Sequence, residues 1–145
     1  MILRQSTFLL TAKATIAAAI LAALLGGCGD PKYQPPAIVV TFDPNFPPPT
    51  SINAGAYWDK GVAADVANDT KAAGVNFSCA PAGDCGTFNP THASTTVPTC
   101  YQAPSPGPTG GTVTITATSS TDPTKFVTSA PITITTGPPG QSYNP

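Results

Sequence analysis

The stretch Gly111-Thr-Val-Thr-Ile-Thr-Ala-Thr-Ser119 contains the clearest structural pattern in the chain. Val113, Ile115 and Ala117 alternate with threonines, so the apolar side chains would fall on one face at a period of two residues. The β-branched residues on both faces also suit an extended backbone. The stretch therefore predicts a half-buried β-strand.

Shorter runs before and after this stretch repeat its alternation. They lie at Ala37–Phe42, Val62–Val66, Val75–Cys79 and Ala130–Ile134, with turn-forming residues between them. The chain also contains 18 prolines, all after Cys28, and these disfavour long helices. We therefore expect an all-β domain over residues 37–135, built as an antiparallel two-sheet sandwich of about seven short strands. The first run is expected at a sheet edge.

Residues 1–27 have the features of a cleavable signal peptide. Arg4 and Lys13 supply a positive flank, and Ala14–Leu25 is an apolar run interrupted only by Thr15. This run is too short to span a bilayer, because a spanning helix needs about 20 apolar residues. We therefore expect a signal-peptide helix and not a transmembrane anchor.

The residues at the expected cleavage point, Leu25-Gly-Gly-Cys28, resemble the lipobox of bacterial lipoproteins. In that family a peptidase cuts before the cysteine after its thiol has received a diacylglycerol. The resemblance implies that Cys28 carries lipid, and acyl chains contribute ~0.8 kcal/mol per buried methylene to membrane binding. Gly29 stands where lipoproteins kept in the inner membrane have Asp, so an outer-membrane location is expected. Residues 28–36 would be a proline-rich tether of ~3.1 Å per residue.

A second resemblance covers most of the remaining chain. It is carried by Val66-Ala-Asn-Asp69, Gly74-Val-Asn-Phe-Ser-Cys79, Cys85-Gly-Thr-Phe88, Tyr101-Gln-Ala-Pro104, and Gly111–Ser119 followed by Asp122-Pro-Thr-Lys125. In this order the segments resemble bacterial Ig-like domains, which are antiparallel β-sandwiches of envelope proteins. Phe77 stands where that family usually has Trp, and Cys100 is an additional thiol. The family implies a binding or spacing role and has no shared catalytic residues.

Three cysteines remain if Cys28 is lipidated. In an oxidising envelope two of them should pair. Cys79 and Cys85 enclose a short loop that can fold back on itself, so we predict a disulfide between them. Cys100 is then unpaired. The favoured interpretation buries it as a small apolar side chain, and the alternative exposes it to form an intermolecular bridge.

A metal site and a catalytic site are both poorly supported. The spacings of Cys79, Cys85, His92 and Cys100 match no zinc-binding pattern. His92 lies in an expected loop without a recognisable nucleophile motif. The seven acidic residues are all Asp, and most have turn-forming neighbours. We therefore expect no metal, no cofactor and no enzymatic activity.

Tyr57 and Trp58 are the residues that could mark a binding surface. Trp58 is in phase with Val62, so the favoured interpretation places it at one end of the sandwich core. In the alternative it is exposed. An aromatic platform beside Asp59 and Lys60 would then be able to stack on a sugar or contact a partner.

The charge of the mature chain argues against nucleic acid as a partner. Removal of residues 1–27 leaves four lysines and seven aspartates, and a chain with this net negative charge does not displace the counterions of nucleic acid. We expect a non-catalytic, lipid-anchored envelope module that contacts the membrane through Cys28 and meets an envelope protein or polysaccharide. The alternative is a carbohydrate-binding or accessory enzyme lipoprotein. Residues 136–145 lack apolar periodicity and are expected to be a disordered tail.

Overall fold

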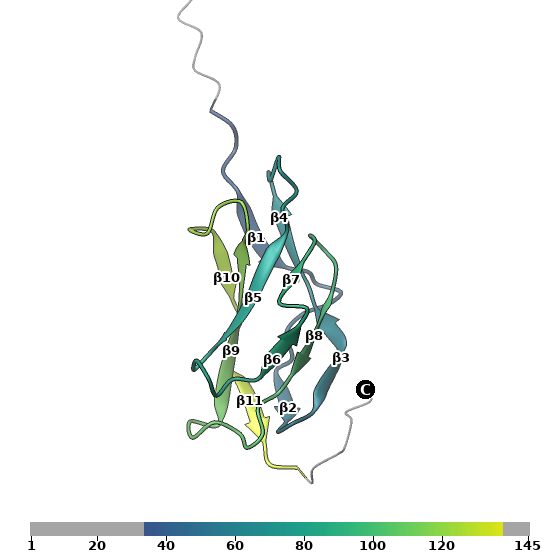
Figure 1. Cartoon of the computed structure of the whole chain (residues 1–145), viewed down its shortest axis with the longest axis vertical. Coiled ribbons are helices and arrows are strands. Elements are labelled where there is room, and N and C mark those ends of the chain that lie inside the picture. Colours follow the sequence, from purple (N-terminus) through teal and green to yellow (C-terminus); the bar gives the residue numbers. More distant parts are fainter. Residues whose placement is uncertain (1–33, 138–145) are drawn as a thin grey trace, which may run out of the picture. The chain divides into compact units, whose positions relative to one another are not determined.

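A computed structural model of the chain describes residues 34–137. Within these residues the chain forms strands, turns and bends, and the all-β expectation is confirmed (Figure 1). The expected signal peptide, Cys28 with the first part of the tether, and residues 138–145 of the expected tail lie outside the described residues.

The strands of the described region are short. In chain order they are β1 (Val39–Phe42), β2 (Ser51–Asn53), β3 (Tyr57–Val62), β4 (Ala64–Ala67), β5 (Val75–Ala80), β6 (Thr87–Asn89), β7 (His92–Ala93), β8 (Thr99–Gln102), β9 (Thr112–Ser119), β10 (Phe126–Thr128) and β11 (Ile132–Thr135). The stretch that predicted a half-buried strand is β9, whose Val113, Ile115 and Ala117 are buried while Thr112 is exposed. That prediction is confirmed.

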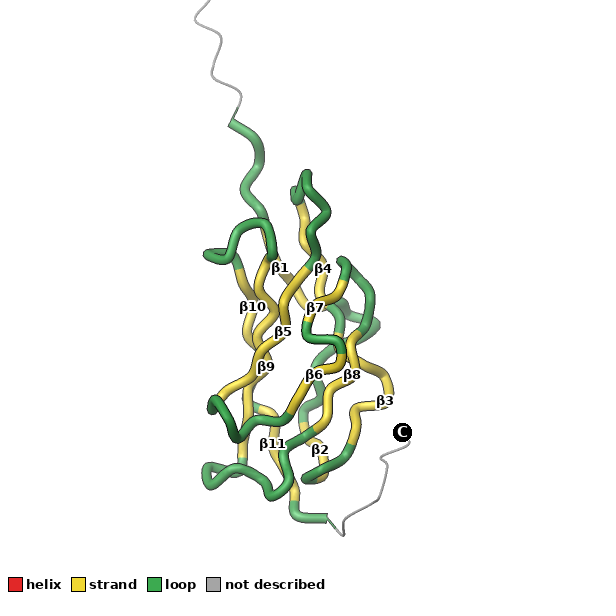
Figure 2. The backbone as a smooth tube through the Cα atoms, viewed as in Figure 1, coloured by secondary structure: helices red, strands yellow, loops and turns green. Residues whose placement is uncertain are grey.

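Three sheets pack around one apolar core in a sandwich-like arrangement (Figure 2). The largest has the order β2-β11-β9-β5-β7, with β10 also paired to β9; the others are β3-β8-β6 and β1-β4. The strand pairs are antiparallel except for β2 and β11, which run parallel with Ile52 opposite Ile134. The antiparallel expectation is wrong for this pair. Because β2 and β11 are far apart in the sequence, no tight turn dictates their relative direction.

The run at Val62–Val66 was expected to be a single strand, and this is wrong. It is divided between the end of β3 and the start of β4, because Val62, Ala63 and Ala64 are all fully buried and do not alternate. At Ala63 the chain leaves the β3-β8-β6 sheet, and the Ala63 N–H donates to Phe46 O at 3.0 Å. The described residues form eleven strands, more than the expected seven, and this division adds one of them.

Aromatic rings from two sheets meet in the core. Phe77 of β5 stacks on Phe88 of β6 with ring centroids 5.5 Å apart, and Phe88 contacts Tyr101 of β8 at 5.1 Å. All three side chains are buried. Aromatic contacts of this kind contribute about 0.5–1.5 kcal/mol beyond their buried area. The aromatic position that the Ig-like resemblance assigned to Phe77 is therefore a core position.

Tyr101 also carries the hydroxyl that links this core to a surface loop. Its Oη donates to the backbone oxygen of Cys85 at 2.6 Å, and Cys85 is disulfide-bonded to Cys79. Burial raises the pKa of Tyr101 to about 12. The phenol consequently stays neutral and remains a hydrogen-bond donor through ordinary alkaline conditions.

We predict that Tyr101→Phe lowers the free energy of unfolding by about 1–3 kcal/mol, because the buried Cys85 carbonyl loses its partner. The difference in unfolding free energy between the wild-type and this variant depends on pH. A tyrosine in the unfolded chain ionises near pH 10 and the folded Tyr101 near 12, so the wild-type loses stability as pH rises between these values. Urea unfolding of both proteins at several pH values measures this. A wild-type and a variant whose stabilities fall equally above pH 10 would contradict the assignment.

Candidate functional site

Tyr57 and Trp58 lie on opposite faces of β3. Trp58 is opposite Tyr101, is half-buried and packs against the apolar core, while its Nε1–H donates to Pro47 O at 3.2 Å. Tyr57 is opposite Gln102 and is 53% exposed. Because neighbouring strand residues point to opposite faces, only Tyr57 is available as an aromatic surface on the outside of the sheet.

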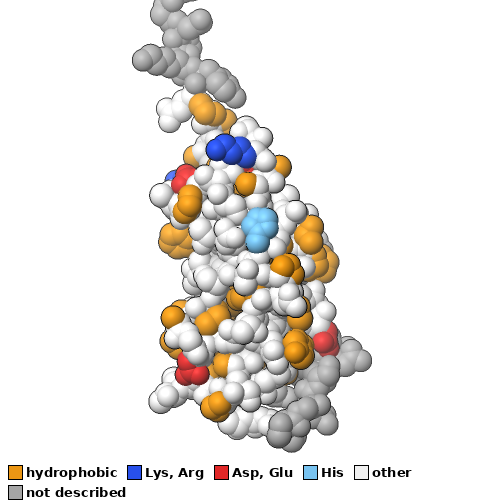
Figure 3. Space-filling model, viewed as in Figure 1, with side chains coloured by type: hydrophobic (Ala, Val, Ile, Leu, Met, Phe, Trp, Pro, Cys, Tyr) orange, Lys and Arg blue, Asp and Glu red, His pale blue; other side chains and the backbone are white. Residues whose placement is uncertain are grey.

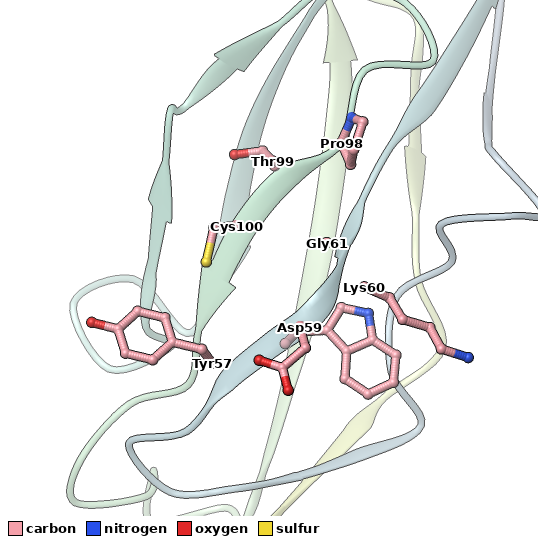
Figure 4. Close-up of a pocket in the computed structure, with 8 residues that line it drawn as sticks. Tyr57, Asp59, Lys60, Gly61, Pro98, Thr99 and Cys100 are labelled. Atoms are coloured by element: carbon pink, nitrogen blue, oxygen red, sulfur yellow. The ribbon is translucent and has the colours of Figure 1, made fainter. Parts of the chain in front are cut away.

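A hollow lies where β3 bulges away from β8. The register between the strands is irregular from Trp58 to Val62, and Gly61 has a φ of +72° within this bulge. A side chain at Gly61 would also approach Pro98 Cβ to 2.9 Å, so the position requires glycine. The hollow has a volume of about 480 Å³ and is lined by Tyr57, Trp58, Asp59, Lys60, Gly61, Pro98, Thr99 and Cys100 (Figure 4).

The outside of the β3-β8-β6 sheet carries mostly polar side chains. Tyr57, Gln102 and Thr87 form one row across the three strands, because Gln102 is opposite both of the others. Cys100 is opposite Asn89 in the next row. We call this surface the Tyr57 face and define it by six residues: Tyr57, Asp59, Thr87, Asn89, Cys100 and Gln102. The sequence did not identify the members of this face on β6 and β8. The available signal was alternation, because Phe88 and Tyr101 are buried and the residues next to them therefore point outward.

The cysteines divide into one bridge and one exposed thiol. Cys79 and Cys85 form a disulfide, as predicted, with their Cα atoms 5.7 Å apart. Cys100 is free and exposed, so the favoured expectation that it is buried is wrong. The reason is alternation on β8, where Thr99 and Tyr101 on either side of Cys100 point into the core.

His92 has a structural contact. The sequence predicted a loop at His92, and this is wrong because His92 lies on β7. Its Nε2 is 2.8 Å from Ala73 O. Of the possible metal ligands, Cys79 and Cys85 are bonded to each other. Among residues 34–137 no three His, Cys or Asp side chains come together in a way that would hold a metal ion.

Two of the aspartates stabilise turns. Asp69 accepts hydrogen bonds from Thr121 Oγ1 and from two backbone N–H groups of its own loop. The Thr121 bond, together with these, holds the pKa of Asp69 below its usual value. The pKa of Asp122 is lowered in the same way, first by the hydroxyl and then by the N–H of Thr124. These carboxylates remain ionised and act as local acceptors in turns.

Comparison of the chain with family models, with curated proteins and with solved structures gives no match. In the region between residues 34 and 137, no helix has the length and apolarity needed to cross a membrane. The predicted lipid site at Cys28 lies before this region. A functional assignment therefore depends on the residues themselves.

Replacement of Trp58 and of Tyr57 by Ala should have different effects on stability. We expect Trp58→Ala to lower the free energy of unfolding by about 2 kcal/mol, because the indole packs on the core and bonds to Pro47. Tyr57→Ala is the matched control and should change stability by less than about 0.5 kcal/mol. Thermal melting measures both. Equal effects would mean that the two side chains do not differ in burial.

The cysteines offer a second comparison. We predict that Cys79→Ala combined with Cys85→Ala lowers the free energy of unfolding by about 2 kcal/mol, the value that loop entropy gives for so short a loop. Cys100→Ala should change it by less than about 0.5 kcal/mol, because this side chain is exposed. Urea unfolding of the double variant and of Cys100→Ala under non-reducing conditions measures both changes. A loss on Cys100→Ala as large as that of the double variant would contradict this assignment.

Proposed function

We propose that this protein is a non-catalytic lipoprotein of the bacterial envelope, in which a single Ig-like β-sandwich is held at the outer membrane by lipid on Cys28. The module meets a protein or polysaccharide partner of the envelope. It contacts neither nucleic acid nor a cofactor, and its role is binding or spacing.

The observation that carries the proposal is the disulfide between Cys79 and Cys85, which closes a short loop whose Cys85 carbonyl accepts a hydrogen bond from Tyr101. Stable structural disulfides belong to exported proteins, because the cytosol keeps thiols reduced. The bridge also lies between segments that resemble the Ig-like family. It therefore supports export, and the resemblance of Leu25–Cys28 to a lipobox supports lipid anchoring.

The lack of a catalytic role is supported by how the polar side chains are used. Asp69 and Asp122 stabilise turns, and His92 contacts a backbone oxygen.

The distribution of charge argues against nucleic acid as a partner. Figure 3 shows charged side chains scattered over the face it draws, without a basic patch. Nucleic acid would require such a patch.

The anchor is tested by the intact mass of the protein extracted from membranes. We expect a mass that lacks residues 1–27 and includes acyl chains. Cys28→Ala is the control, because a chain without the thiol should be neither acylated nor cleaved at this point. A wild-type mass without lipid would overturn the anchored assignment, and so would equal membrane retention of the variant.

A further inference from the structure

The end of the domain at which the chain enters β1 carries two exposed apolar side chains. Val39 is the first residue of β1 and Phe126 the first of β10, and they are 50% and 60% exposed. The two strands lie side by side, and in each the next residue, Val40 or Val127, packs on the core. Because neighbouring strand residues point to opposite faces, Val39 and Phe126 point outward. Apolar side chains that are exposed in the same region indicate a contact surface.

Two turns complete this end of the domain. Residues 68–74 join β4 to β5, and residues 120–125 join β9 to β10. Thr121 of the second turn donates from its Oγ1 to Asp69 Oδ1 of the first at 2.8 Å, so the turns are held together. We call this surface the entry end and define it by Val39, residues 68–74, residues 120–125 and Phe126.

The charges in the turns of the entry end balance. Asp69 and Lys71 lie in the first turn, and Asp122 and Lys125 in the second. Both carboxylates accept hydrogen bonds within their own turns. Without a net charge these turns are neither attracted to nor repelled by a charged partner, so the apolar side chains decide what this end contacts. Lysines beside apolar residues suit a phospholipid surface, because the ammonium groups can reach phosphates while the stems remain among apolar groups.

The expected tether keeps the entry end close to the membrane. The chain has eight residues from Cys28 to Pro36, about 25 Å in a polyproline conformation. Asn68 Nδ2 donates to Ala37 O at 2.9 Å, so the chain joins the domain at this end. A short tether gives a surface an effective concentration of the order of millimolar. Even a weak contact between the entry end and lipid is therefore formed for much of the time.

We propose that the entry end docks on the phospholipid surface that holds the acyl chains of Cys28. Phe126 and Val39 insert among the head groups, and Lys71 and Lys125 contact the lipid phosphates. This inference rests on the proposed function, since it requires lipid on Cys28. It adds a second contact with the membrane, made by the folded domain itself.

Docking at this end holds the Tyr57 face away from the lipid. Tyr57 is ten residues before Ala67 along β3 and β4, and Ala67 is opposite Val39. At ~3.3 Å per residue these strands span up to about 30 Å. A large envelope partner can therefore reach the Tyr57 face while the entry end stays on the membrane.

The test uses the full lipoprotein, extracted from membranes and reconstituted into phosphatidylcholine vesicles with or without bromine on the acyl chains. Bromine quenches tryptophan fluorescence, and the wild-type has a single tryptophan, Trp58, next to Tyr57. Phe126→Trp adds an indole to the entry end, and Tyr57→Trp is the matched control. We expect bromine to remove at least about half of the emission that Phe126→Trp adds, because an interfacial side chain lies ~5–10 Å into the lipid boundary. The wild-type and Tyr57→Trp should lose no emission.

A second reporter on the same surface keeps the test independent of any one variant. Val39→Trp should show the same quenching as Phe126→Trp. When Val39→Trp is combined with Phe126→Asp, the emission should return to its value without bromine, because an ionised carboxylate is costly to bring into lipid. Melting of each variant verifies folding.

Sedimentation with the vesicles reports the anchor separately. A protein that sediments with the vesicles, and whose introduced indoles are not quenched, would overturn docking and leave the anchor intact. A protein that does not sediment with them would overturn both. Equal quenching of Phe126→Trp and Tyr57→Trp would overturn the orientation. Emission that changes with protein density and not with bromine would show that a second copy covers the entry end, which would also overturn the proposal.

Discussion

The contact of Phe77, Phe88 and Tyr101 is the interaction on which the other features of the domain depend. These rings join β5 of the largest sheet to the β3-β8-β6 sheet. The inward position of Tyr101 determines the rest of β8, since Cys100 and Gln102 must then point outward. Through the Cys85 carbonyl the same tyrosine also orders the disulfide loop. Tyr101 thus contributes to the core, to the order of the disulfide loop and to the orientation of the exposed residues on β8.

Much of the fold follows from local pattern. The alternation in Gly111–Ser119 predicted β9, and that in Val75–Cys79 predicted β5. Apolar residues two positions apart lie on the same face of a strand, so this pattern can be recognised within a single segment. The break at Ala63 was not predictable in this way. There three consecutive residues are buried as the chain passes between sheets, and a local pattern does not reveal such a crossing. The parallel pairing of β2 with β11 depends on partners about 80 residues apart in the sequence.

The candidate site was predictable only in part. The sequence singled out Tyr57 and Trp58, but adjacent residues of a strand cannot share a face. Which of them points outward is decided by pairing with Tyr101 and Gln102, more than 40 positions later. The exposure of Cys100 has the same origin. Residue type favoured its burial, and the tertiary register overrode that preference.

The division of β6, β8 and the start of β3 into an inner and an outer row has an evolutionary consequence. Substitutions at exposed strand positions usually change stability by less than about 0.5 kcal/mol, whereas the buried ring positions tolerate little. Tyr57, Thr87 and Asn89 can therefore be exchanged one at a time while Phe88 and Tyr101 preserve the scaffold. A lineage that carries this domain is able to acquire new recognition properties through surface drift alone, without passing through an unstable ancestor.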